Sequence, residues 1–463
     1  MRGVFWGEAR AATPVFLMAA ALTMAASRAE DVLIVGDSLS REYAIEFPAL
    51  FPNRPEAWGA RNWAELLQEH RPERFDMGSE AQWFGAFAGF LGLFGGALDW
   101  LDADMAWHAY NWAIPGAESS DWHDILDEDF YFLLRAPMDL QIQDTAERAV
   151  VFLGGNDLKN HYGDFYDGRE PGGFATRRAG NVKDTVEYLR DRNASMQIVV
   201  VGWPDVGVTP EVMTEFPDPE RRALVTEMTR AINDDLRAWS EQQGIGFAEI
   251  FDLTVEVQGP RPFCRWGIGF EKGFDPLPQS NREQFLFSPD GFHPNTAVHI
   301  IFANQILEAF NALGDAVPIP LIEDEEAREI LGLDPAPDYA DWLEIWSLTG
   351  AAATADEDGD GLPLSVEFAL GSRPDAPDVD SVLRLGNSGD ENRRILSYRP
   401  DPGAACHVDV MAEESGDLKG WQVVPAARLR GAAMGWVDVL AEEGSGGGYV
   451  RLRVAGLPEP PAE

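Results

Sequence analysis

The sequence has 463 residues, which is enough for one full-sized domain and a smaller one. Apolar residues make up 45% of it, so the chain can bury a sizeable core and is not disordered as a whole. The formal net charge of −42 would repel phosphate groups, and it therefore argues against nucleic acids and anionic membrane surfaces as partners.

The N-terminus is typical of a signal peptide. Two arginines precede an apolar run over residues 14–26, which is shorter than the ~20 residues that a membrane-spanning helix needs. Residues 27–29 fit a cleavage site, so we predict removal of residues 1–29, with an uncleaved anchor as the alternative. No later run predicts a stable membrane span. We therefore expect a secreted protein, located in the periplasm, outside the cell or on its surface.

Export would permit disulfides. The sequence has two cysteines, Cys264 and Cys406, and a change in composition between them predicts that they lie in different domains. We therefore do not expect them to pair, and we expect core packing and a bound metal to provide the stability.

Apolar runs of strand length alternate with helical patterns as far as residue 314. Residues 181–192 and 219–244 have apolar side chains at helical spacing, and the second pattern ends in a glycine that suits a helix C-cap. A last helical pattern covers residues 296–313. Apolar strands separated by helices predict βαβ units and a mostly parallel sheet. The predicted strands are 32–35, 108–114, 149–154, 197–202 and 246–251.

A lone serine stands at the end of the first predicted strand, where Gly36 and Asp37 lead to Ser38. In a doubly wound sheet, the residues that bind ligands and substrates lie beyond the carboxyl ends of the strands. Gly36 permits a tight turn there, and the next helix would point its positive N-terminus at Ser38. That position suits a nucleophile, although a serine at a strand end is, on its own, more often a helix cap.

A second motif supplies the base that a serine nucleophile needs. His293 lies in a loop just before the last predicted helix, with Asp290 three residues earlier. The aspartate can orient the imidazole, and the imidazole can take the proton of Ser38. Of the seven histidines, His293 alone combines an upstream acid with such a loop, whereas His299 is more typical of a packed helix residue.

Two further strand ends carry groups that can stabilise an oxyanion. Gly116 follows the second predicted strand, and Asn156 follows the third, within residues 154–157. The backbone N–H groups of Ser38 and Gly116, together with the Asn156 amide, would provide three donors. Each residue alone is an ordinary turn residue, and the informative feature is that all the groups fall at successive strand ends.

Together these motifs resemble the four sequence blocks of the SGNH/GDSL hydrolase family, over about residues 31–314. The resemblance implies a flavodoxin-like three-layer α/β/α sandwich and the hydrolysis of carboxylic esters through an acyl-enzyme. It also implies that Ser38 is the nucleophile, His293 the general base and Asp290 the orienting acid. The oxyanion hole would be formed by Ser38, Gly116 and Asn156.

A long insertion separates the first two blocks, which departs from compact members of that family and leaves the substrate open. Residues 83–98 within it are rich in aromatic residues and glycine. One interpretation is a wall or lid that binds an acyl chain beside Ser38. The other is a helix pair buried against the sheet, because ligand sites and cores share an apolar lining. We take acyl-chain binding by residues 83–98 as a hypothesis.

A separate group of acidic residues lies near residue 360. The stretch from Asp356 to Glu367 matches the spacing of the twelve-residue calcium loop, in which hard oxygens surround a hard cation. Gly361 takes the position of the sharp turn, and the alternative is an acidic, solvated loop. The predicted ligands of a structural Ca²⁺ are Asp356, Asp358, Asp360, the carbonyl of Leu362, and Glu367.

Composition changes after the predicted hydrolase domain, residues 30–316. Residues 317–340 are typical of a linker, and residues 341–380 hold the calcium loop. From 381 to 463, short alternating runs predict a small all-β sandwich. The loop segment resembles thrombospondin type 3 and dockerin-like modules, and C-terminal regions of secreted bacterial enzymes. That resemblance implies a structural ion and leaves contact with a cell surface or polysaccharide as an open alternative.

The sequence thus predicts a secreted serine hydrolase that cleaves carboxylic esters, either lipid acyl esters or O-acetylated carbohydrate. No cofactor is expected for catalysis. Two alternatives stay open: a non-catalytic, calcium-stabilised binding or adhesion protein on an inactive hydrolase fold, and an acyltransferase that uses the same triad. All the catalytic positions are filled, which favours the hydrolase.

Overall fold

A computed structural model describes most of the chain. Residues 1–28 of the predicted signal peptide and the proposed acyl-binding segment 83–98 lie outside the described residues, so both stay predictions. Within the described part, no helix is long and apolar enough to cross a membrane. The described residues are 29–81, 107–169, 172–314, 317–387, 394–425, 428–431, 436–440 and 449–457.

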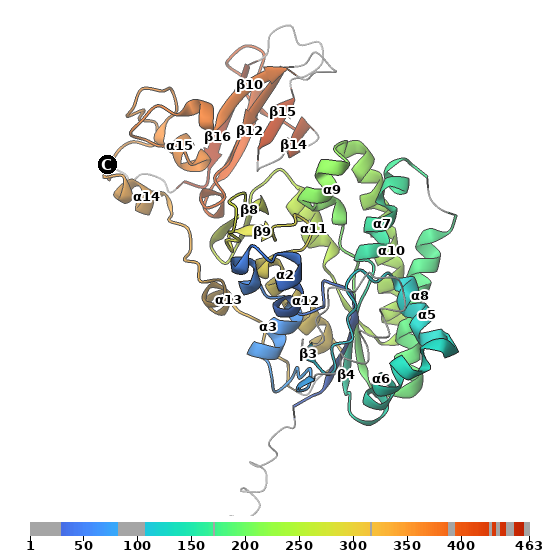
Figure 1. Ribbon diagram of the computed structural model, residues 1–463. Helices are drawn as coiled ribbons and strands as arrows, with labels where there is room; N and C mark the ends of the chain where they lie inside the picture. Colours follow the sequence, from blue (N-terminus) through green and yellow to red (C-terminus); the bar gives the residue numbers. More distant parts are fainter. Residues whose placement is uncertain are drawn as a thin grey trace, which may run out of the picture.

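Four parallel strands form the central sheet, in the order β1-β4-β5-β6 (Figure 1). Almost every strand residue is buried, because a parallel sheet is covered on both faces, and this explains the near-continuous apolar runs. The predicted, mostly parallel sheet is therefore confirmed. The strands are β1 (Val32–Gly36), β4 (Arg148–Phe152), β5 (Gln197–Val201) and β6 (Gly246–Ala248).

The predicted strand over residues 108–114 is only partly a strand. Residues 110–114 run parallel to β1 and form three backbone hydrogen bonds of 2.9–3.0 Å with Ile34 and Gly36. The start of β1 pairs instead with Asp76. Two chain segments thus share the edge of the sheet, and the order from this edge segment through β1, β4, β5 and β6 is that of a flavodoxin-like fold.

The long insertion leaves the sheet between these two edge segments. The chain turns outward at Gly78, whose φ of 79° favours glycine. A short antiparallel ribbon of β2 (Glu80–Ala81) and β3 (Trp107–His108) closes the base of the insertion. An edge strand is hydrogen-bonded on one side only, so it can be interrupted without breaking the ladder inside the sheet. The ribbon is tied to the chain after β1, because the Arg41 guanidinium lies 3.3 Å from the centre of the Trp107 ring.

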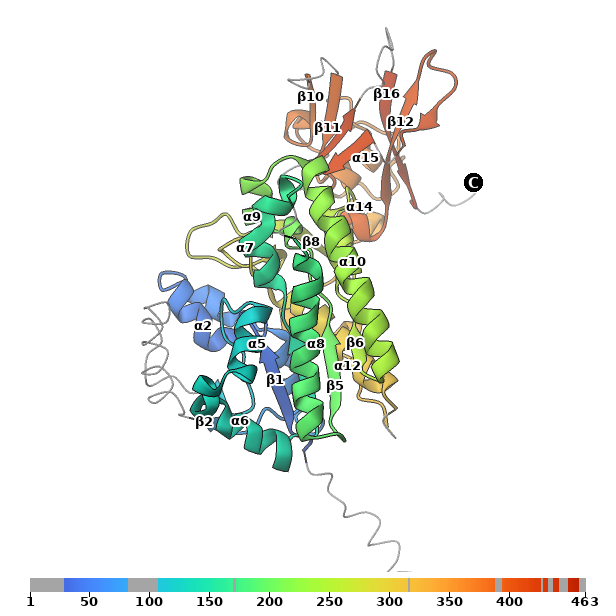
Figure 2. The ribbon, with the colours of Figure 1, turned by 90° about the vertical axis from the view of Figure 1, so that its right-hand side faces the viewer.

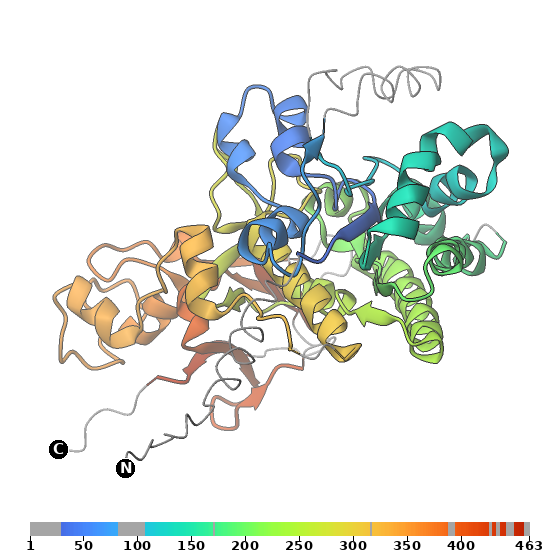
Figure 3. The same ribbon diagram turned by 90° about the horizontal axis from the view of Figure 1, so that it is seen from below.

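Helices cover both faces of the sheet, as the predicted three-layer α/β/α sandwich requires. Figure 2 shows α8 and α10 in front of the sheet, and Figure 3 shows helices on either side of it from below. Ile34 and Val150 belong to one core, and Leu33 and Val151 to the other, because side chains alternate along a strand. One layer consists of α3 (Trp63–His70) and α12 (Thr296–Ala312), and the other of α5 (Ser119–Asp127), α6 (Phe132–Asp144), α7 (Gly155–Tyr166), α8 (Phe174–Arg192) and α10 (Pro219–Gln243).

Shorter elements connect these layers, and several of them lie between the sheet and the C-terminal region (Figure 1). One group is a three-stranded sheet of order β7-β8-β9. The shorter elements are α2 (Tyr43–Leu50), η1 (Pro55–Gly59), η3 (Asp129–Tyr131), η4 (Val206–Val208), α9 (Pro210–Glu215), α11 (Phe251–Gln258), β7 (Phe263–Arg265), β8 (Ile268–Phe274) and β9 (Phe285–Phe287).

The C-terminal region contains two antiparallel sheets around a shared core, in agreement with the predicted all-β fold class. One sheet has the order β10-β11-β15-β14 and the other the order β13-β12-β16. Val439 from the first sheet and Ala412 from the second pack in the same cluster. The elements are α13 (Asp324–Leu331), α14 (Tyr339–Ile345), α15 (Leu364–Leu370), η5 (Val379–Ser381), β10 (Leu383–Asn387), β11 (Arg394–Tyr398), η6 (Ala404–Cys406), β12 (Asp409–Ser415), β13 (Gln422–Val423), β14 (Leu429–Gly431), β15 (Val437–Leu440) and β16 (Tyr449–Ala455).

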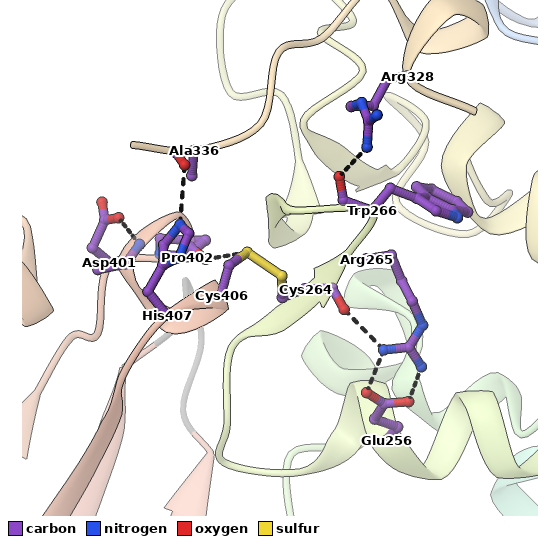
Figure 4. Close-up of a disulfide and its surroundings, with 11 residues drawn as sticks. Glu256, Cys264, Arg265, Trp266, Arg328, Ala336, Asp401, Pro402, Cys406 and His407 are labelled. Carbon is purple, nitrogen blue, oxygen red and sulfur yellow. Dashed lines mark hydrogen bonds and ion pairs between the residues drawn. A yellow bond between two sulfur atoms is a disulfide. The ribbon is translucent and has the colours of Figure 1, made fainter. Parts of the chain in front are cut away.

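The two cysteines form a disulfide, so the prediction that they stay unpaired is wrong (Figure 4). Cys264 lies in β7 and Cys406 in η6, 142 residues later. The prediction fails because it treats the two regions as separate, whereas η6 packs directly on β7 and β8. The contact is tight: a side chain at Gly269 would collide with the backbone of Pro402. The disulfide therefore fastens the C-terminal region to the α/β domain.

Candidate active site

Ser38 lies in the turn that follows β1, at the carboxyl end of the sheet. Glycine is needed just before it, because a Cβ at Gly36 would lie 2.7 Å from the hydroxyl of Ser40. The Asp37 carboxylate accepts the N–H of Leu39 at 2.9 Å and closes the turn. The sharp turn brings the serine out of the sheet immediately after the strand ends.

The helix expected directly after Ser38 begins only at Tyr43. Two buried asparagines hold the intervening loop instead. Nδ2 of Asn111 donates to the carbonyl of Ser40 at 3.0 Å, and Nδ2 of Asn62 donates to the carbonyl of the next residue. Neither asparagine is predicted from the sequence, because a single asparagine carries no signal of a loop that lies far away along the chain. Both fix the backbone that presents the serine.

The structure brings Ser38, His293 and Asp290 together. Nε2 of His293 lies 2.9 Å from Oγ of Ser38, and Nδ1 lies 2.5 Å from Oδ2 of Asp290. An ionised carboxylate can only accept a hydrogen bond, so Nδ1 carries a proton, and in the neutral imidazole Nε2 is left to accept from the serine hydroxyl. In this arrangement the imidazole can remove the serine proton while the serine oxygen attacks a carbonyl carbon.

Asp290 is fixed by three hydrogen bonds to its other oxygen. Oδ1 accepts from the Ser288 hydroxyl at 2.8 Å and from the N–H groups of Phe292 and His293 at 2.9 and 3.0 Å. Burial raises the pKa of Asp290, but the charge of His293 and the hydrogen bonds from its ring and from the two N–H groups outweigh burial. The pKa therefore lies well below its usual range, and the aspartate stays ionised at neutral pH.

Gly116 and Asn156 stand at the carboxyl ends of the two chain segments that flank β1. Gly116 follows the edge segment and has a φ of 78°, which favours glycine. Asn156 is the second residue of α7, and its Nδ2 donates to the carbonyl of Ala117 at 3.2 Å. The loops that carry the two predicted oxyanion-hole residues are thus in contact, and they follow the chain segments on either side of the strand that carries Ser38.

Asp157 holds these two loops together, a role not predicted from the sequence. Its buried carboxylate accepts both the N–H and the hydroxyl of Ser119 at 2.8 Å and pairs with Nε of Arg178 at 3.3 Å. Ser119 begins α5, just after Gly116. The network therefore ties the Gly116 turn to α7, which carries Asn156. The position of Asp157 beside Asn156 was the only hint in the sequence.

A second buried carboxylate acts on His293. Glu46 lies on the face of α2 whose Tyr43 and Phe47 rings stand edge-on to the imidazole, with centroids 6.2 and 6.5 Å away. Burial lowers the pKa of His293, but the charges of Asp290 and Glu46 and the hydrogen bond from Asp290 outweigh burial and raise the pKa to about 9. Burial also raises the pKa of Glu46 to about 7. Glu46 is not predicted, because acidic residues on short helices are usually exposed.

We expect the activity to rise with pH. The imidazole acts as a base only when it is neutral, so kcat/KM should increase through the His293 pKa of about 9 and then level off. Glu46→Gln removes a carboxylate that favours the protonated imidazole, and the midpoint should move to lower pH. The measurement is the pH profile of p-nitrophenyl acetate hydrolysis, corrected for spontaneous hydrolysis. The exposed Glu56→Gln should keep the wild-type midpoint, and a Glu46→Gln profile identical to wild type would contradict the assignment.

An apolar pocket is lined by neighbours of Ser38 and His293 along the chain. Leu39, the residue after Ser38, lines it, as do Phe292 and Pro294 on either side of His293. The other lining residues come from the loop after β5, from α11, from β9 and from α12. The main apolar residues among them are Val206, Val208, Leu253, Val257, Phe287 and Phe302.

The predicted calcium ligands lie in the loop between α14 and α15 and in the first turn of α15. Asp356, Asp358 and Asp360 each bring a carboxylate oxygen within 4.8 Å of the others. Leu362 lies just before α15, and Glu367 lies in its first turn. None of these residues belongs to the group around Ser38.

Comparison with solved structures finds distant similarity. A carbohydrate esterase family 3 structure from Talaromyces cellulolyticus is 14% identical, with a TM-score of 0.31, and the match covers 62% of this chain and 100% of that one. The lipase Lip_vut3 from a goat rumen metagenome is 14% identical, with a TM-score of 0.33 and coverage of 62% and 97%. An extracellular lipase from Streptomyces rimosus is 13% identical, with a TM-score of 0.31 and coverage of 62% and 98%.

A family model provides the assignment. The model described as GDSL-like Lipase/Acylhydrolase matches residues 32–306, which is more than half of the chain. The comparison with curated proteins gives no match. The matched range contains Ser38, Asp290 and His293, together with the turns around Gly116 and Asn156. The chain therefore belongs to the GDSL-like lipase/acylhydrolase family and is a carboxylic ester hydrolase.

Proposed function

We propose that the protein is a secreted serine esterase that cleaves short-chain acyl esters through an acyl-enzyme on Ser38. The observation that carries this proposal is the continuous set of hydrogen bonds from Ser38 through His293 to Asp290, at 2.9 and 2.5 Å. The test is hydrolysis of p-nitrophenyl acetate, which the wild type should catalyse and Ser38→Ala should not.

The first half of the reaction acylates the serine. Nε2 of His293 takes the hydroxyl proton as Oγ of Ser38 bonds to the ester carbonyl carbon. The carbonyl oxygen becomes an oxyanion, which the Ser38 and Gly116 N–H groups and the Asn156 amide would stabilise. When the intermediate collapses, the carbon–oxygen bond to the alcohol breaks, and the imidazolium protonates the leaving oxygen. The acyl group stays on Ser38.

The second half releases the acid. A water molecule gives a proton to Nε2 of His293 and bonds to the acyl carbon, forming a second oxyanion at the same donors. Collapse of this intermediate breaks the bond to Oγ, and the imidazolium returns a proton to Ser38. Throughout, Asp290 holds the ring through Nδ1 and stabilises its positive charge.

Two observations support export. The apolar N-terminal run is typical of a signal peptide. The disulfide between Cys264 and Cys406 suits an oxidising compartment, because disulfides are rare where thiols are kept reduced. We therefore infer that the enzyme acts outside the inner membrane.

The apolar pocket supports a short acyl chain as the group that is transferred. Its Thr209 and Thr254 hydroxyls donate to backbone carbonyls at 2.8 and 2.6 Å, so they need no partner from a ligand. Its walls are built from buried side chains, among them Phe287 and Phe302. We infer that an acyl chain enters this pocket from the side of Ser38 and that these walls limit its length, which suits acetyl to butyryl esters better than long lipid chains. Acetylated carbohydrate falls within this range.

Filling the pocket should shorten the preferred acyl chain. Val257→Phe on α11 adds volume to the pocket wall, so hydrolysis of p-nitrophenyl butyrate should fall about tenfold or more relative to the acetate, since a methylene that no longer fits changes rates about 10- to 200-fold. A chain-length series from acetate to palmitate measures this ratio. Val255→Phe, on the half-buried side of the same helix, is the control and should keep the wild-type ratio. An unchanged series in Val257→Phe would place acyl binding elsewhere.

A further inference from the structure

A buried carboxylate in the C-terminal region lacks the partners that burial requires. Glu367, in the first turn of α15, is fully buried. Among the residues that the structure describes, neither of its two oxygens has a hydrogen-bond partner. Removing an ionised carboxylate from water is unfavourable unless a cation or several donors compensate its charge. The Glu367 carboxylate is therefore placed as a ligand of a bound cation would be placed.

Three aspartates of the preceding loop act on this carboxylate. Oxygens of Asp356, Asp358 and Asp360 lie within 4.8 Å of one another, and all three charges interact with Glu367. The loop backbone fixes part of this group, since the N–H of Leu362 donates to Oδ1 of Asp360 at 2.8 Å. Oδ2 of Asp358 is buried and, within the described residues, also without a partner. Like charges gathered in this way repel one another unless a cation lies between them.

Asp378 is a fifth carboxylate of the same cluster, and it lies outside the twelve-residue loop. Its N–H donates to Oδ2 of Asp360 at 3.3 Å, and its own Oδ2 accepts the N–H of Arg373 at 3.3 Å. Its Oδ1 is buried and has no partner in the described part of the chain. Its charge also acts on Glu367. The loop spacing could not predict Asp378, because only the folded chain brings it to the loop.

We propose that this cluster is a structural calcium site, and that Asp378 completes it from outside the loop. Ca²⁺ takes six to eight oxygen ligands in flexible geometry, whereas Mg²⁺ demands a near-ideal octahedron and keeps several waters. An all-carboxylate cluster with a backbone carbonyl suits the larger ion. The ligands are Asp356, Asp358, Asp360, the carbonyl of Leu362, Glu367 and Asp378.

A single helix, α15, connects the site to the contact between the C-terminal region and the α/β domain. The carbonyl of Ala369, on α15, accepts the N–H of Asp401 at 3.0 Å. The carboxylate of Asp401 accepts the N–H of Ala404 at 2.8 Å, and Ala404 begins η6, which carries Cys406 of the disulfide. Bound calcium would therefore fix α15 and so stabilise this contact. We expect calcium to raise the melting temperature of the whole chain.

Calcium titration of the full mature chain tests the site. After treatment with EDTA and desalting, isothermal titration calorimetry with CaCl₂ should give one site per chain, and CaCl₂ should raise the melting temperature. Glu367→Gln and Asp378→Asn should each weaken binding about tenfold or more, because the loss of even a partner that only orients a metal ligand costs about 10- to 100-fold in affinity. Asp380→Asn removes the same charge from an exposed position near Asp378 and should bind like the wild type.

The outcomes separate the two parts of the proposal. No heat and no change in melting temperature for the wild type would overturn the site. Wild-type affinity in Asp378→Asn, with weakened binding in Glu367→Gln, would overturn the role of Asp378. Circular dichroism and p-nitrophenyl acetate hydrolysis show whether each variant is folded. If Glu367→Gln does not fold, Asp358→Asn in the half-buried loop takes its place, with the same expected loss.

Discussion

Replacing Ser38 by alanine is expected to lower kcat for ester hydrolysis by roughly 10⁴- to 10⁶-fold. The substitution removes the oxygen that lies 2.9 Å from Nε2 of His293 and would form the acyl-enzyme. The oxyanion donors and the pocket stay in place, so a small rate above that of water should remain. The measurement is p-nitrophenyl acetate hydrolysis at pH 9, where a larger share of the imidazole is neutral than at pH 7.

Ser40→Ala is the matched control for this experiment. It removes a buried hydroxyl from the same turn, and within the described residues that hydroxyl has no hydrogen-bond partner. We expect kcat close to that of the wild type. Ser38→Ala with most of the wild-type kcat, in a preparation free of other esterases, would show that the nucleophile is another group.

Gly154→Ala is expected to destabilise the protein by about 4 kcal/mol or more, the range reached when a core position is severely overpacked. Gly154 has a φ of 124°, and a Cβ there would lie 2.2 Å from the ring of Trp203. The Trp203 side chain is fully buried and cannot give way into solvent. Because Gly154 caps α7, the same change should also displace Asn156 and lower activity. Thermal unfolding followed by circular dichroism measures the effect.

Gly180→Ala provides the matched control, because the same methyl group is added without a clash. Gly180 lies within α8, and the space around a Cβ there is open to 4 Å. Alanine favours a helix by up to about 1 kcal/mol over glycine, so this variant should unfold at the wild-type temperature or above it. Equal melting temperatures for Gly154→Ala and the wild type would mean that the Trp203 contact is not as close as described.

The parallel sheet could be predicted from its apolar runs, and three residues of the candidate site could be predicted because they stand at strand ends. Parallel strands end at one edge, so groups that follow different strands are brought together by the fold itself. Ser38, Gly116 and Asn156 each follow a strand or strand segment, and their proximity needs no knowledge of the loops. His293 could be predicted from a local pattern, because the acidic residue Asp290 lies three residues upstream of it. The parallel sheet followed from continuous apolar runs between helices.

The supporting residues could not be predicted, because their roles depend on packing between distant parts of the chain. Asn62 and Asn111 hold the loop after Ser38, and Asp157 ties two loops together, but no local pattern marks these contacts. The disulfide was missed for the same reason: nothing local in the sequence around Cys264 and Cys406 indicates that two differently composed regions pack against each other.

The insertion shows a further limit of local patterns. Residues 108–114 have the composition of one strand, yet the ribbon uses Trp107–His108 and the sheet edge uses residues 110–114. The division depends on where the insertion rejoins the sheet, which composition does not reveal. Acyl-chain binding by residues 83–98 stays a hypothesis, and contact of the C-terminal region with a cell surface or polysaccharide stays an open alternative.

Covalent labelling shows whether Ser38 carries the acyl group during hydrolysis. The chain is treated with a fluorophosphonate ester, which bonds to an activated serine, and peptide mass spectrometry locates the label. We expect one label per chain on the peptide that contains Ser38, loss of hydrolysis in step with labelling, and no label in Ser38→Ala. A label on another residue, or hydrolysis that continues after Ser38 is fully labelled, would contradict this role of Ser38.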